Sequence, residues 1–437
     1  MRTAPSASAD VVIVGAGLAG LRCAERIASA GLEVVVLEAG DVVGGRQRTD
    51  RVDGFLLDRG FQVLNPAYPA VRRWVDVAGL DLRAFPVGIR VRREGGWAEL
   101  GHPLRRPRSI PATLGSGMLH PRDVAGFARW LAPALLRPRS VIAGADRTLA
   151  AAWDAAGLRG PLRVEVLEPF LAGVLAEDRG TTSDAFARLL VRMFALGAPG
   201  VPAAGIGALP QQLAARARAT GADIRTGARV VGIDRRQRGR RRRVRIAGAR
   251  SLSAGAVVVA VGPGAVAGLL DVPAPATRGL QTWWFAADAP PAGSGLLVVD
   301  GRRAGPIVNS VAMTRTAPSY APPGRHLVQA TALLPRTARA DPAAAPSEPD
   351  IRRHLAELWG ASASDWRLLR RDDVHDALPA QSPPLRTTSP ARLDDGLYVA
   401  GDHRDTASIQ GALVSGDRVG RAVLRDLGII APRDDGD

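Results

Sequence analysis

A strand, a glycine-rich turn and a helix in immediate succession constrain this chain more than any other feature. The run VVIV at residues 11–14 is β-branched and apolar, as buried parallel strands are. Three glycines follow it in the pattern G-x-G-x-x-G: Gly15, Gly17 and Gly20. The apolar periodicity then predicts a helix to about Ala30, and the next apolar run, LEVVVLE, predicts a second strand that ends at Glu38.

Each glycine of this turn has a mechanical role in a strand–helix–strand unit. The first allows the tight turn, the second lets a pyrophosphate approach the backbone, and the third lets the helix pack closely on the sheet. Free N–H groups at the helix N-terminus would receive the diphosphate. Glu38 would accept hydrogen bonds from a ribose 2′-hydroxyl and would repel a 2′-phosphate, which argues against NADP. The residues assigned to this dinucleotide site are Gly15, Ala16, Gly17, Leu18, Ala19, Gly20, Glu38 and Ala39. The pattern leaves NAD and FAD open.

Composition places the chain among ordinary globular proteins. It has 437 residues, 46% of them hydrophobic, and length alone allows roughly two to four domains. Its longest apolar runs fall far short of a membrane span, and its first residues lack a signal-peptide pattern. We therefore expect a cytoplasmic protein, or one held peripherally at a membrane surface.

Cysteine and histidine usage argues against several kinds of site. The one cysteine, Cys23, allows neither an intrachain disulfide nor a cysteine metal cluster, and we expect it to fill space inside the first helix. Apart from His403, the histidines stand singly without metal-ligand spacing: His102, His120, His326, His354 and His375. We expect no metal site.

The net charge is +16, and all 58 basic residues are arginine. Codon bias in a GC-rich genome is the simpler explanation, and an anionic partner is the functional one. The densest basic run lies between two strand-like segments, so we interpret it first as a solvated hairpin tip, then as a lipid contact, and last as a nucleic-acid contact. Its members are Arg235, Arg236, Arg238, Arg240, Arg241, Arg242 and Arg243. No nucleic-acid-binding motif accompanies it, and we expect no such partner.

The segment VVGGRQRT at residues 42–49 follows the second predicted strand. It resembles the Gly-Gly-Arg signature of the FAD-dependent oxidoreductases that include monoamine oxidases, protoporphyrinogen oxidases and carotenoid (phytoene) desaturases. Gly44 and Gly45 would leave room for backbone beside the cofactor, and the planar guanidinium of Arg46 would face a phosphate. The resemblance, closest to the phytoene desaturase-like branch, implies FAD.

Two further segments resemble the same family. DGFLLDRGFQVLN, at residues 53–65, would bring Gly60 and Phe61 to the flavin ring, although core packing also explains the phenylalanine. VPAAGIGALPQQL and its continuation resemble the segment that re-enters the FAD domain, with Ala-Gly in place of the usual Gly-Gly and Ile in place of Met. There the backbone of Val230 or Val231 would contact the adenine end.

The C-terminal motifs complete the resemblance. LYVAGD predicts a strand that ends at Gly401 and Asp402, with the aspartate on the ribityl chain, and QGALVSG begins a helix. Backbone N–H groups at the start of that helix would stabilise negative charge on the reduced flavin: Gln410, Gly411 and Ala412. His403 would either shuttle a proton or serve as a turn residue.

The resemblance implies an α/β fold (α+β overall), in which a substrate domain twice interrupts a Rossmann-like FAD domain with a parallel sheet. The FAD domain is predicted over residues 10–85, 201–270 and 375–428, and the substrate domain, of mixed sheet and helices, over 86–200 and 271–374. Residues 1–9 and 429–437 are predicted as tails. Trp283, Trp284 and Phe285 would line a substrate cavity or pack in the core.

Absent residues narrow the chemistry that the resemblance implies. Amine oxidases of this family generally use an active-site lysine, and the chain has none; monoamine oxidases attach flavin through a C-terminal cysteine, and Cys23 lies elsewhere. We therefore expect non-covalent FAD that takes two electrons from an apolar substrate such as a terpenoid or polyene, with oxygen or a quinone as acceptor. Three alternatives stay open: a reduced-FAD isomerase, an amine or amino-acid oxidase, and a flavin-binding protein without turnover.

Overall fold

The computed structural model describes residues 8–235, 241–293 and 295–429. Its first sheet has eight strands in the order β10-β11-β12-β1-β2-β9, with β19 paired to both β12 and β18. The strands are β1 (Ser8–Val14), β2 (Val34–Leu37), β9 (Asp223–Arg225), β10 (Val230–Ile233), β11 (Arg242–Ile246), β12 (Leu252–Val259), β18 (Arg392–Asp394) and β19 (Leu397–Val399). The central strands β19, β12, β1, β2 and β9 are parallel. This arrangement confirms the prediction that the first strand belongs to a parallel sheet.

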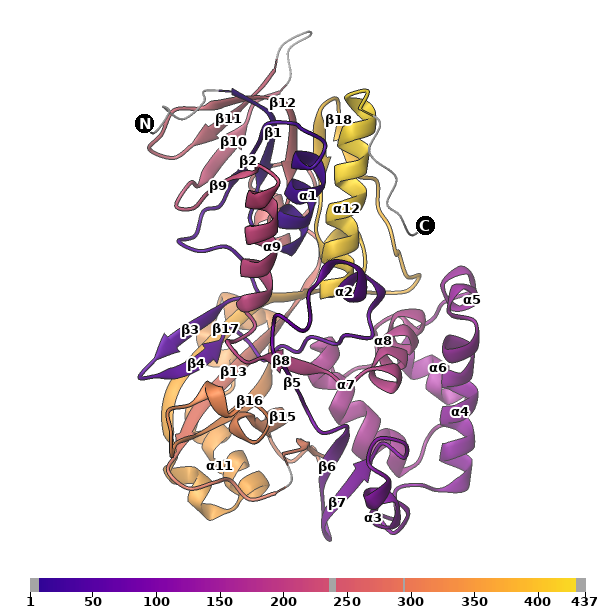
Figure 1. The fold of residues 1–437 in the computed structure, drawn as a ribbon. Coiled ribbons are helices and arrows are strands. Elements are labelled where there is room, and N and C mark those ends of the chain that lie inside the picture. The colour runs from indigo at the N-terminus through magenta and orange to yellow at the C-terminus, as the bar shows by residue number, and fades with distance from the viewer. Residues whose placement is uncertain (1–7, 236–240, 294, 430–437) are drawn as a thin grey trace.

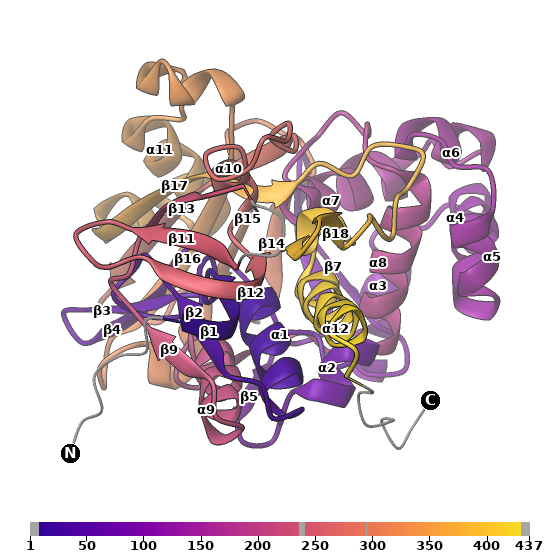
Figure 2. The same ribbon diagram turned by 90° about the horizontal axis from the view of Figure 1, so that it is seen from above.

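Three helices cover one face of this sheet (Figure 1): α1 (Leu18–Ala28), α9 (Ala208–Ala219) and α12 (Ile409–Asp426). Their apolar faces share one core with the inward side chains of β1, β2 and β12, and Cys23 is buried in it as expected. α1 and α12 lie side by side in both ribbon views (Figure 1 and Figure 2), although they are the first and the last helix of the described chain. The sheet is thus built from distant segments.

Two expectations at the edges of this sheet need correction. Ser8 and Ala9, expected in a tail, belong to β1 and pair with β12, because their ladder partners continue there. Arg242, expected on a solvated hairpin tip, is buried and ion-paired with Asp394 at the start of β11. The hairpin itself is confirmed by the antiparallel pairing of β10 and β11. Three arginines of its basic run lie outside the described residues: Arg236, Arg238 and Arg240.

The second sheet has seven strands in the order β17-β13-β16-β15-β14-β6-β7. They are β6 (Gly88–Arg93), β7 (Gly96–Gly101), β13 (Thr277–Ala287), β14 (Leu297–Asp300), β15 (Ile307–Ala312), β16 (His326–Leu334) and β17 (Arg367–Pro379). Helix α11 (Glu348–Trp359) packs on one face of it. The expected domain boundary at residue 375 falls inside β17, whose pairing with β13 continues to Pro379. The assignment of cofactor and substrate roles to the two domains stays a prediction.

Helices from residues 110–196 form a third part beside the second sheet, at the lower right of Figure 1. They are α3 (Ile110–Leu114), α4 (Pro121–Leu136), α5 (Pro138–Ala143), α6 (Leu149–Ala155), a π-helical turn (Leu162–Leu167), α7 (Glu168–Leu175) and α8 (Asp184–Leu196). A core of its own holds this helical part together, with Trp130 and Trp153 in edge-to-face contact at 5.8 Å between ring centroids. In the described part of the chain, no helix combines the length and apolar character needed to cross a membrane.

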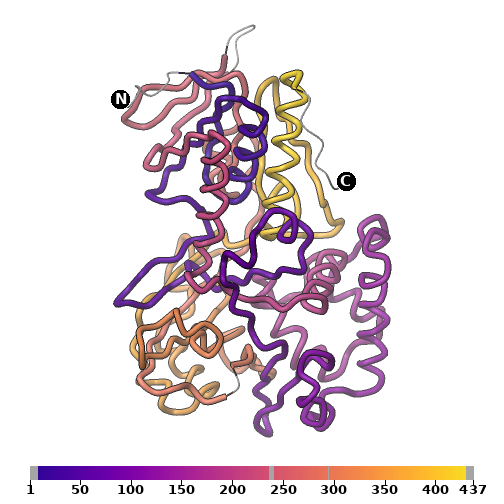
Figure 3. Tube along the Cα trace, in the orientation of Figure 1, coloured from indigo at the N-terminus to yellow at the C-terminus, as the bar shows by residue number. Residues whose placement is uncertain are grey.

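Short elements connect these parts, as the chain trace in Figure 3 shows. They are β3 (Thr49–Val52), β4 (Phe55–Asp58), α2 (Pro69–Trp74), β5 (Leu82–Ala84), β8 (Gly200–Pro202) and α10 (Pro263–Val266). Buried Asp58 accepts hydrogen bonds from the Thr49 hydroxyl at 2.6 Å, the Ile206 N–H at 3.0 Å and the Tyr320 hydroxyl at 2.9 Å. One carboxylate therefore joins the segment before α9 to a loop of the second sheet.

The aromatic run on β13 packs in the core. Trp283 and Phe285 lie in the core under α11, with rings stacked at 6.5 Å between centroids, and Trp284 lies in a separate core on the opposite face. None of the three lines the cavity described below. Of the two interpretations of this run, the core one holds.

Candidate functional site

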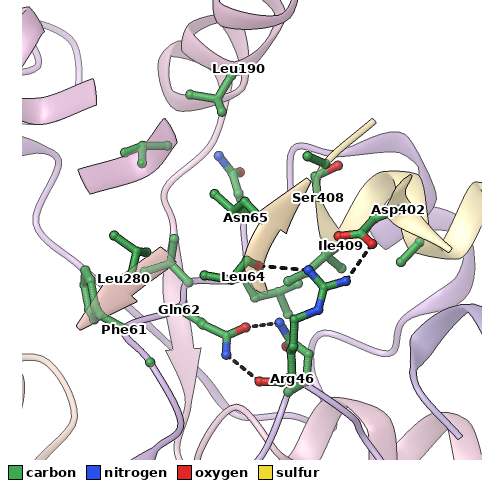
Figure 4. Close-up of a pocket in the computed structure, with 18 of the residues that line it drawn as sticks. Arg46, Phe61, Gln62, Leu64, Asn65, Leu190, Leu280, Asp402, Ser408 and Ile409 are labelled. Carbon is green, nitrogen blue, oxygen red and sulfur yellow. Dashed lines mark hydrogen bonds and ion pairs between the residues drawn. The ribbon is translucent and has the colours of Figure 1, made fainter. Parts of the chain in front are cut away.

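A cavity of about 1270 Å³ lies where the first sheet, the second sheet and the helical part meet (Figure 4). We call the lining residues from the first sheet and its loops and helices the glycine wall, and those from the second sheet and the helical part the apolar wall. The predicted site residues that line it are Gly15, Gly17, Leu18, Ala19, Glu38, Ala39, Gly44, Gly45, Arg46, Gly60, Phe61, Val230, Val231, Gly401, Asp402 and Ala412. The structure thus brings together residues predicted from five separate segments.

Gly17 and Gly45 form a cradle in the glycine wall. A Cβ added to Gly17 would meet no heavy atom within 4 Å, and one added to Gly45 would meet only the Gly17 Cα, at 3.7 Å. Gly17 also caps α1 without a side-chain hydrogen bond, so the first N–H groups of the helix have no protein acceptor of their own. Open space beside free N–H groups at a helix N-terminus fits a diphosphate.

Glu38 follows β2 at the edge of the cavity, and backbone donors hold both of its carboxylate oxygens. The Ala16 N–H donates to Oε2 and the Gly40 N–H donates to Oε1, each at 2.8 Å. Each oxygen has further lone pairs, so the fixed carboxylate can still accept hydrogen bonds from the two hydroxyls of a ribose. The residues present fit the adenosine half of a dinucleotide.

Arg46 and Asp402 form an ion pair in the glycine wall (Figure 4). Arg46 Nη2 lies 2.6 Å from Asp402 Oδ1, and Nη1 donates to the Ala377 carbonyl at 2.8 Å. The sequence motifs predict separate partners for these two residues, a phosphate for Arg46 and a ribityl chain for Asp402, and do not predict that they pair. Because 356 positions separate them, no local pattern could have revealed the pair.

Two glutamines beside Arg46 are site residues that sequence reasoning missed. Gln62 Nε2 donates to the Arg46 carbonyl at 2.7 Å and its Oε1 accepts from Gln47 Nε2 (Figure 4). Gln47 is buried and lines the cavity, yet its Oε1 has no hydrogen-bond partner. An orphaned acceptor next to the Gly-Gly turn fits a bound group that supplies a donor.

Phe61 satisfies both of its interpretations, since it lines the cavity and also packs edge-to-face on Phe85 with 6.0 Å between ring centroids.

At the far side of the glycine wall, the pairing of β10 with β11 shifts register between Val230 and Gly232. Val231 therefore falls at an irregularity of the ladder, as a residue that offers its backbone to a ligand would.

The C-terminal helix begins one residue earlier than expected. α12 starts at Ile409 and is capped by Ser408, whose hydroxyl accepts from the Gly411 N–H at 3.0 Å. The Ala412 N–H donates to the Ser408 carbonyl, so these two predicted donors are already paired. The first N–H groups of the helix, at Ile409 and Gln410, have no intrahelical acceptor, and Ser408 and Ile409 line the cavity (Figure 4).

Five predicted site residues lie outside the cavity lining: Ala16, Gly20, His403, Gln410 and Gly411. A Cβ on Gly20 would overlap the Gly15 carbonyl oxygen, and one on Gly411 would overlap that of Thr406, so both glycines serve close packing. Ala16 acts through its N–H on Glu38. The Gln410 side chain accepts from the Ala70 N–H at 2.8 Å and ties α12 to α2.

His403 packs behind Asp402. Neither ring nitrogen has a hydrogen-bond partner, and the ring lies against Gly401. Burial lowers the pKa of His403 to about 4, with Asp402 opposing that shift, so the imidazole is neutral near pH 7. A ligand in the cavity does not reach it directly.

The apolar wall came from segments without a recognisable motif, and sequence reasoning missed it. Its largest side chains are Phe127, Leu131, Leu162, Phe170, Leu190, Phe194 and Leu280. Phe170 and Phe194 meet edge-to-face at 5.2 Å between centroids. Among the described residues that line the cavity, the only carboxylates are Glu38 and Asp402, and both belong to the glycine wall. The same described ranges hold no cluster of side chains suited to a metal ion.

Comparison with known proteins agrees with this geometry. Residues 18–424 match the family model described as flavin containing amine oxidoreductase. Putrescine oxidase from Kocuria rosea is 47% identical over 72 residues, which are 16% of this chain and 15% of that protein. L-amino-acid oxidase from Crotalus adamanteus is 37% identical over 108 residues, 25% of this chain and 20% of that protein. The matched stretches thus span about a fifth or less of these relatives.

Solved structures match over nearly the whole chain. An oxidoreductase from Methanosarcina mazei superposes with a TM-score of 0.73 at 20% identity, covering 94% of this chain and 99% of that one. Cyclohexylamine oxidase from Brevibacterium oxydans gives a TM-score of 0.65 at 18% identity, covering 96% and 100%. At these identities the likeness establishes a shared fold.

Proposed function

Because the chain belongs to the flavin-containing amine oxidoreductases and is an FAD-dependent oxidoreductase, we propose that it oxidises an apolar molecule, a terpenoid or other polyene, at a carbon–hydrogen bond. One observation carries this proposal: the described residues of the apolar wall include no carboxylate. A buried ammonium group needs a partner of opposite charge. The wall offers aliphatic and aromatic surface instead, which favours an uncharged substrate.

The glycine wall would hold the cofactor. Its cradle at Gly17 and Gly45 suits the diphosphate, and Glu38 suits the ribose. FAD, when bound, supplies the two-electron acceptor for a hydride equivalent. Asp402, fixed by Arg46, would accept hydrogen bonds from the ribityl hydroxyls. The N-terminus of α12 would stabilise negative charge placed near it.

The chain's own residues do the remaining work by position and by exclusion of water. Phe61, Leu190 and Leu280 line the cavity on its apolar side (Figure 4), where they would hold a hydrocarbon chain and keep solvent away. The apolar wall need not supply a base, because the proton released with the hydride equivalent would be taken up by FAD on its full reduction.

Amine oxidation is the second candidate, and the family model and the amine and amino-acid oxidases among the relatives favour it. Against it stand the absence of lysine from the whole sequence and the uncharged apolar wall. An isomerase that uses reduced FAD without net oxidation shares the same requirements as the first proposal. The acceptor of the electrons, oxygen or a quinone, depends on access to the cofactor and is a separate question.

Anaerobic stopped-flow absorbance of the purified holoprotein tests the proposal. Mixing with a panel of apolar polyenes should bleach the flavin band, and mixing with primary amines and amino acids should not. Bleaching by amines alone would overturn the proposal in favour of the second candidate. A product of unchanged mass, formed only by pre-reduced protein, would identify an isomerase. Readmitting oxygen or a quinone then shows which of them reoxidises the flavin.

We also propose that the protein rests peripherally on an anionic membrane through residues 100–122, which join the second sheet to α4. Leu104 is 87% exposed and Leu114 is 68% exposed, and exposed arginines stand beside them: Arg105, Arg108 and Arg122. The segment contains no acidic residue. Exposed Pro103 also lines the cavity, so a lipid-dissolved substrate would enter where the protein touches the bilayer.

Co-sedimentation with vesicles tests this contact. The protein should pellet with vesicles rich in phosphatidylglycerol and stay in the supernatant with pure phosphatidylcholine. Replacing Leu104 and Leu114 together by Asp should abolish pelleting, while the matched change Leu427→Asp, at another exposed leucine, should not. Equal binding by all three forms of the protein would contradict the proposal.

A further inference from the structure

One polar side chain stands unpaired in the apolar wall. Asn309, on β15, is 4% exposed and lines the cavity, and its Oδ1 has no hydrogen-bond partner. Asn65, equally buried at 4% and also in the lining, is fully engaged: its Nδ2 donates to the Met193 carbonyl and its Oδ1 accepts from the Ala67 N–H, both at 2.9 Å. The Asn65 amide stabilises a turn through these two bonds, whereas the Asn309 amide makes no hydrogen bond to the backbone.

The helical part makes room for this amide. Gly173, on α7, faces Asn309, and a Cβ added there would overlap the amide nitrogen Nδ2. Any other residue at position 173 would displace the side chain of Asn309. The flanking helical residues Phe170 and Val174 line the cavity with apolar surface. The amide therefore occupies a notch beside the hydrocarbon side chains that α7 contributes to the wall.

A buried amide oxygen without a partner is unfavourable, and buried polar groups are nearly always hydrogen-bonded. A half-turn about the last bond of the side chain exchanges the positions of the amide oxygen and the amide NH₂. A hydroxyl can donate to the first or accept from the second, so it suits either orientation. An ammonium could donate to the amide oxygen, but its charge would stay uncompensated, because the amide is neutral and no described residue of the apolar wall supplies a carboxylate.

We infer that Asn309 binds a single hydroxyl group of an otherwise apolar substrate and so selects which end of the molecule enters the apolar wall. The substrate class is then an alcohol with a long hydrocarbon body rather than a pure hydrocarbon. This inference rests on the proposed function, because it assumes that the apolar wall receives the substrate.

Binding of a matched pair of probes to the holoprotein tests it. Farnesol and farnesene have the same fifteen-carbon polyene skeleton, and only the first carries a hydroxyl. Each is titrated against oxidised holoprotein, and its dissociation constant is taken from the shift of the flavin absorption band. We expect farnesol to bind about tenfold more tightly than farnesene, the effect of one additional hydrogen bond.

Asn309→Leu keeps the branching at Cγ but removes the amide, so it should weaken the binding of farnesol by about tenfold and leave the binding of farnesene unchanged. Gly173→Ala displaces the amide without removing it, so it should also weaken the binding of farnesol alone, but by less. This variant keeps the test available if Asn309→Leu does not fold. Leu280→Met is the matched control. It alters the apolar wall without changing hydrogen bonding, so it should change the dissociation constants of both probes by the same factor.

Two results would overturn the inference. If wild-type protein binds both probes equally, or if Asn309→Leu and Gly173→Ala weaken both probes to the same degree, the amide has only a packing role, and oxidation of an apolar substrate stands without it. If neither probe shifts the flavin band, the apolar wall takes no such molecule, and the proposed function fails together with the inference.

Discussion

The two walls of the cavity are made in different ways. In the glycine wall, backbone geometry and fixed charge define the surface: open space at Gly17 and Gly45, two N–H groups on Glu38, and the Arg46–Asp402 pair. In the apolar wall, the volumes of side chains such as Leu190 define the surface. A wall made of backbone tolerates almost no substitution, whereas a wall made of side chains can be reshaped one residue at a time. We therefore expect the first to fix the cofactor and the second to set the substrate.

The largest expected effect comes from filling the cradle of the glycine wall. Gly17→Val places a branched side chain in the space that suits the diphosphate, so FAD should bind at least about a thousandfold more weakly, about 4 kcal/mol. The melting temperature of the cofactor-free protein should change little, because a Cβ at this position meets no neighbour within 4 Å. Flavin absorbance per protein and thermal unfolding of both forms measure the two quantities.

Gly31→Ala is the control for this change. Gly31 has a φ of +84° and equally open surroundings, so alanine should cost about 1 kcal/mol of stability or somewhat more and leave FAD bound. Normal flavin content in Gly17→Val would show that the diphosphate does not lie in this cradle.

A second prediction concerns the carboxylate that joins the parts carrying the two walls. Burial raises the pKa of Asp58 to about 6, although hydrogen bonds from Thr49, Ile206 and Tyr320 oppose the shift. An unfolded chain would have a value of about 3.9, so the folded state binds this proton more tightly. The resulting contribution to stability is complete below about pH 4 and is lost as the pH rises through 6.

Asp58→Asn keeps a neutral side chain at every pH and so removes this dependence. The free energy of unfolding of the variant, relative to wild type, should rise by up to roughly 3 kcal/mol between pH 4 and pH 7. Urea unfolding at a series of pH values measures it. A difference that stays constant over this range would mean that Asp58 titrates normally in the folded protein.

A third and smaller effect should come from the apolar wall. Leu190→Asn places an unpaired amide in it, which costs about 1–3 kcal/mol when a hydrocarbon covers the group. The value of kcat/KM for an apolar substrate should fall by about tenfold to a hundredfold, with flavin content unchanged. Leu190→Met keeps the surface apolar, so its kcat/KM should stay within about threefold of the wild-type value. A loss of FAD in Leu190→Asn would show that the walls are not independent.

The smallest effect is expected at His403. Because its neutral ring lies outside the cavity lining and makes no hydrogen bond that the change would break, His403→Gln should retain FAD and turn over within about twofold of wild type across pH 6–9. Steady-state rates against pH check this. A tenfold fall in kcat with a shifted pH profile would instead assign the histidine a role in proton transfer.

The two walls also differ in how much of them the sequence reveals. Most glycine-wall residues were predicted because each glycine or acid has a role fixed by local backbone: Gly15 and Gly17 in the turn, Glu38 after the next strand. The same reasoning could not show that the last helix begins at Ile409 rather than at Gln410, since this start depends on the hydrogen bond by which Ser408 caps the helix. The parallel sheet followed from buried β-branched runs.

The apolar wall could not be predicted, because apolar residues on helices look alike whether they face a core or a cavity. Phe127 and Trp130 stand three positions apart on α4, yet Trp130 is buried in the core and Phe127 lines the cavity. Asn309 gave no signal, because its isolation from any partner exists only after β15 and α7 pack together. Arg242 was misplaced for the same reason: its burial depends on Asp394, far along the chain.

The ion pair between Arg46 and Asp402 has a consequence for the order of assembly. Its two members are 356 positions apart. Strand β19 is added to the sheet that β1 begins, and α12 packs on the face of that sheet. On a ribosome, which delivers the chain from its first residue onward, the nascent polypeptide exposes the glycine turn long before Asp402 exists. The part of the glycine wall that holds this ion pair is therefore incomplete until Asp402 and α12 have been synthesised, so a cofactor that needs both members of the pair would bind after that point.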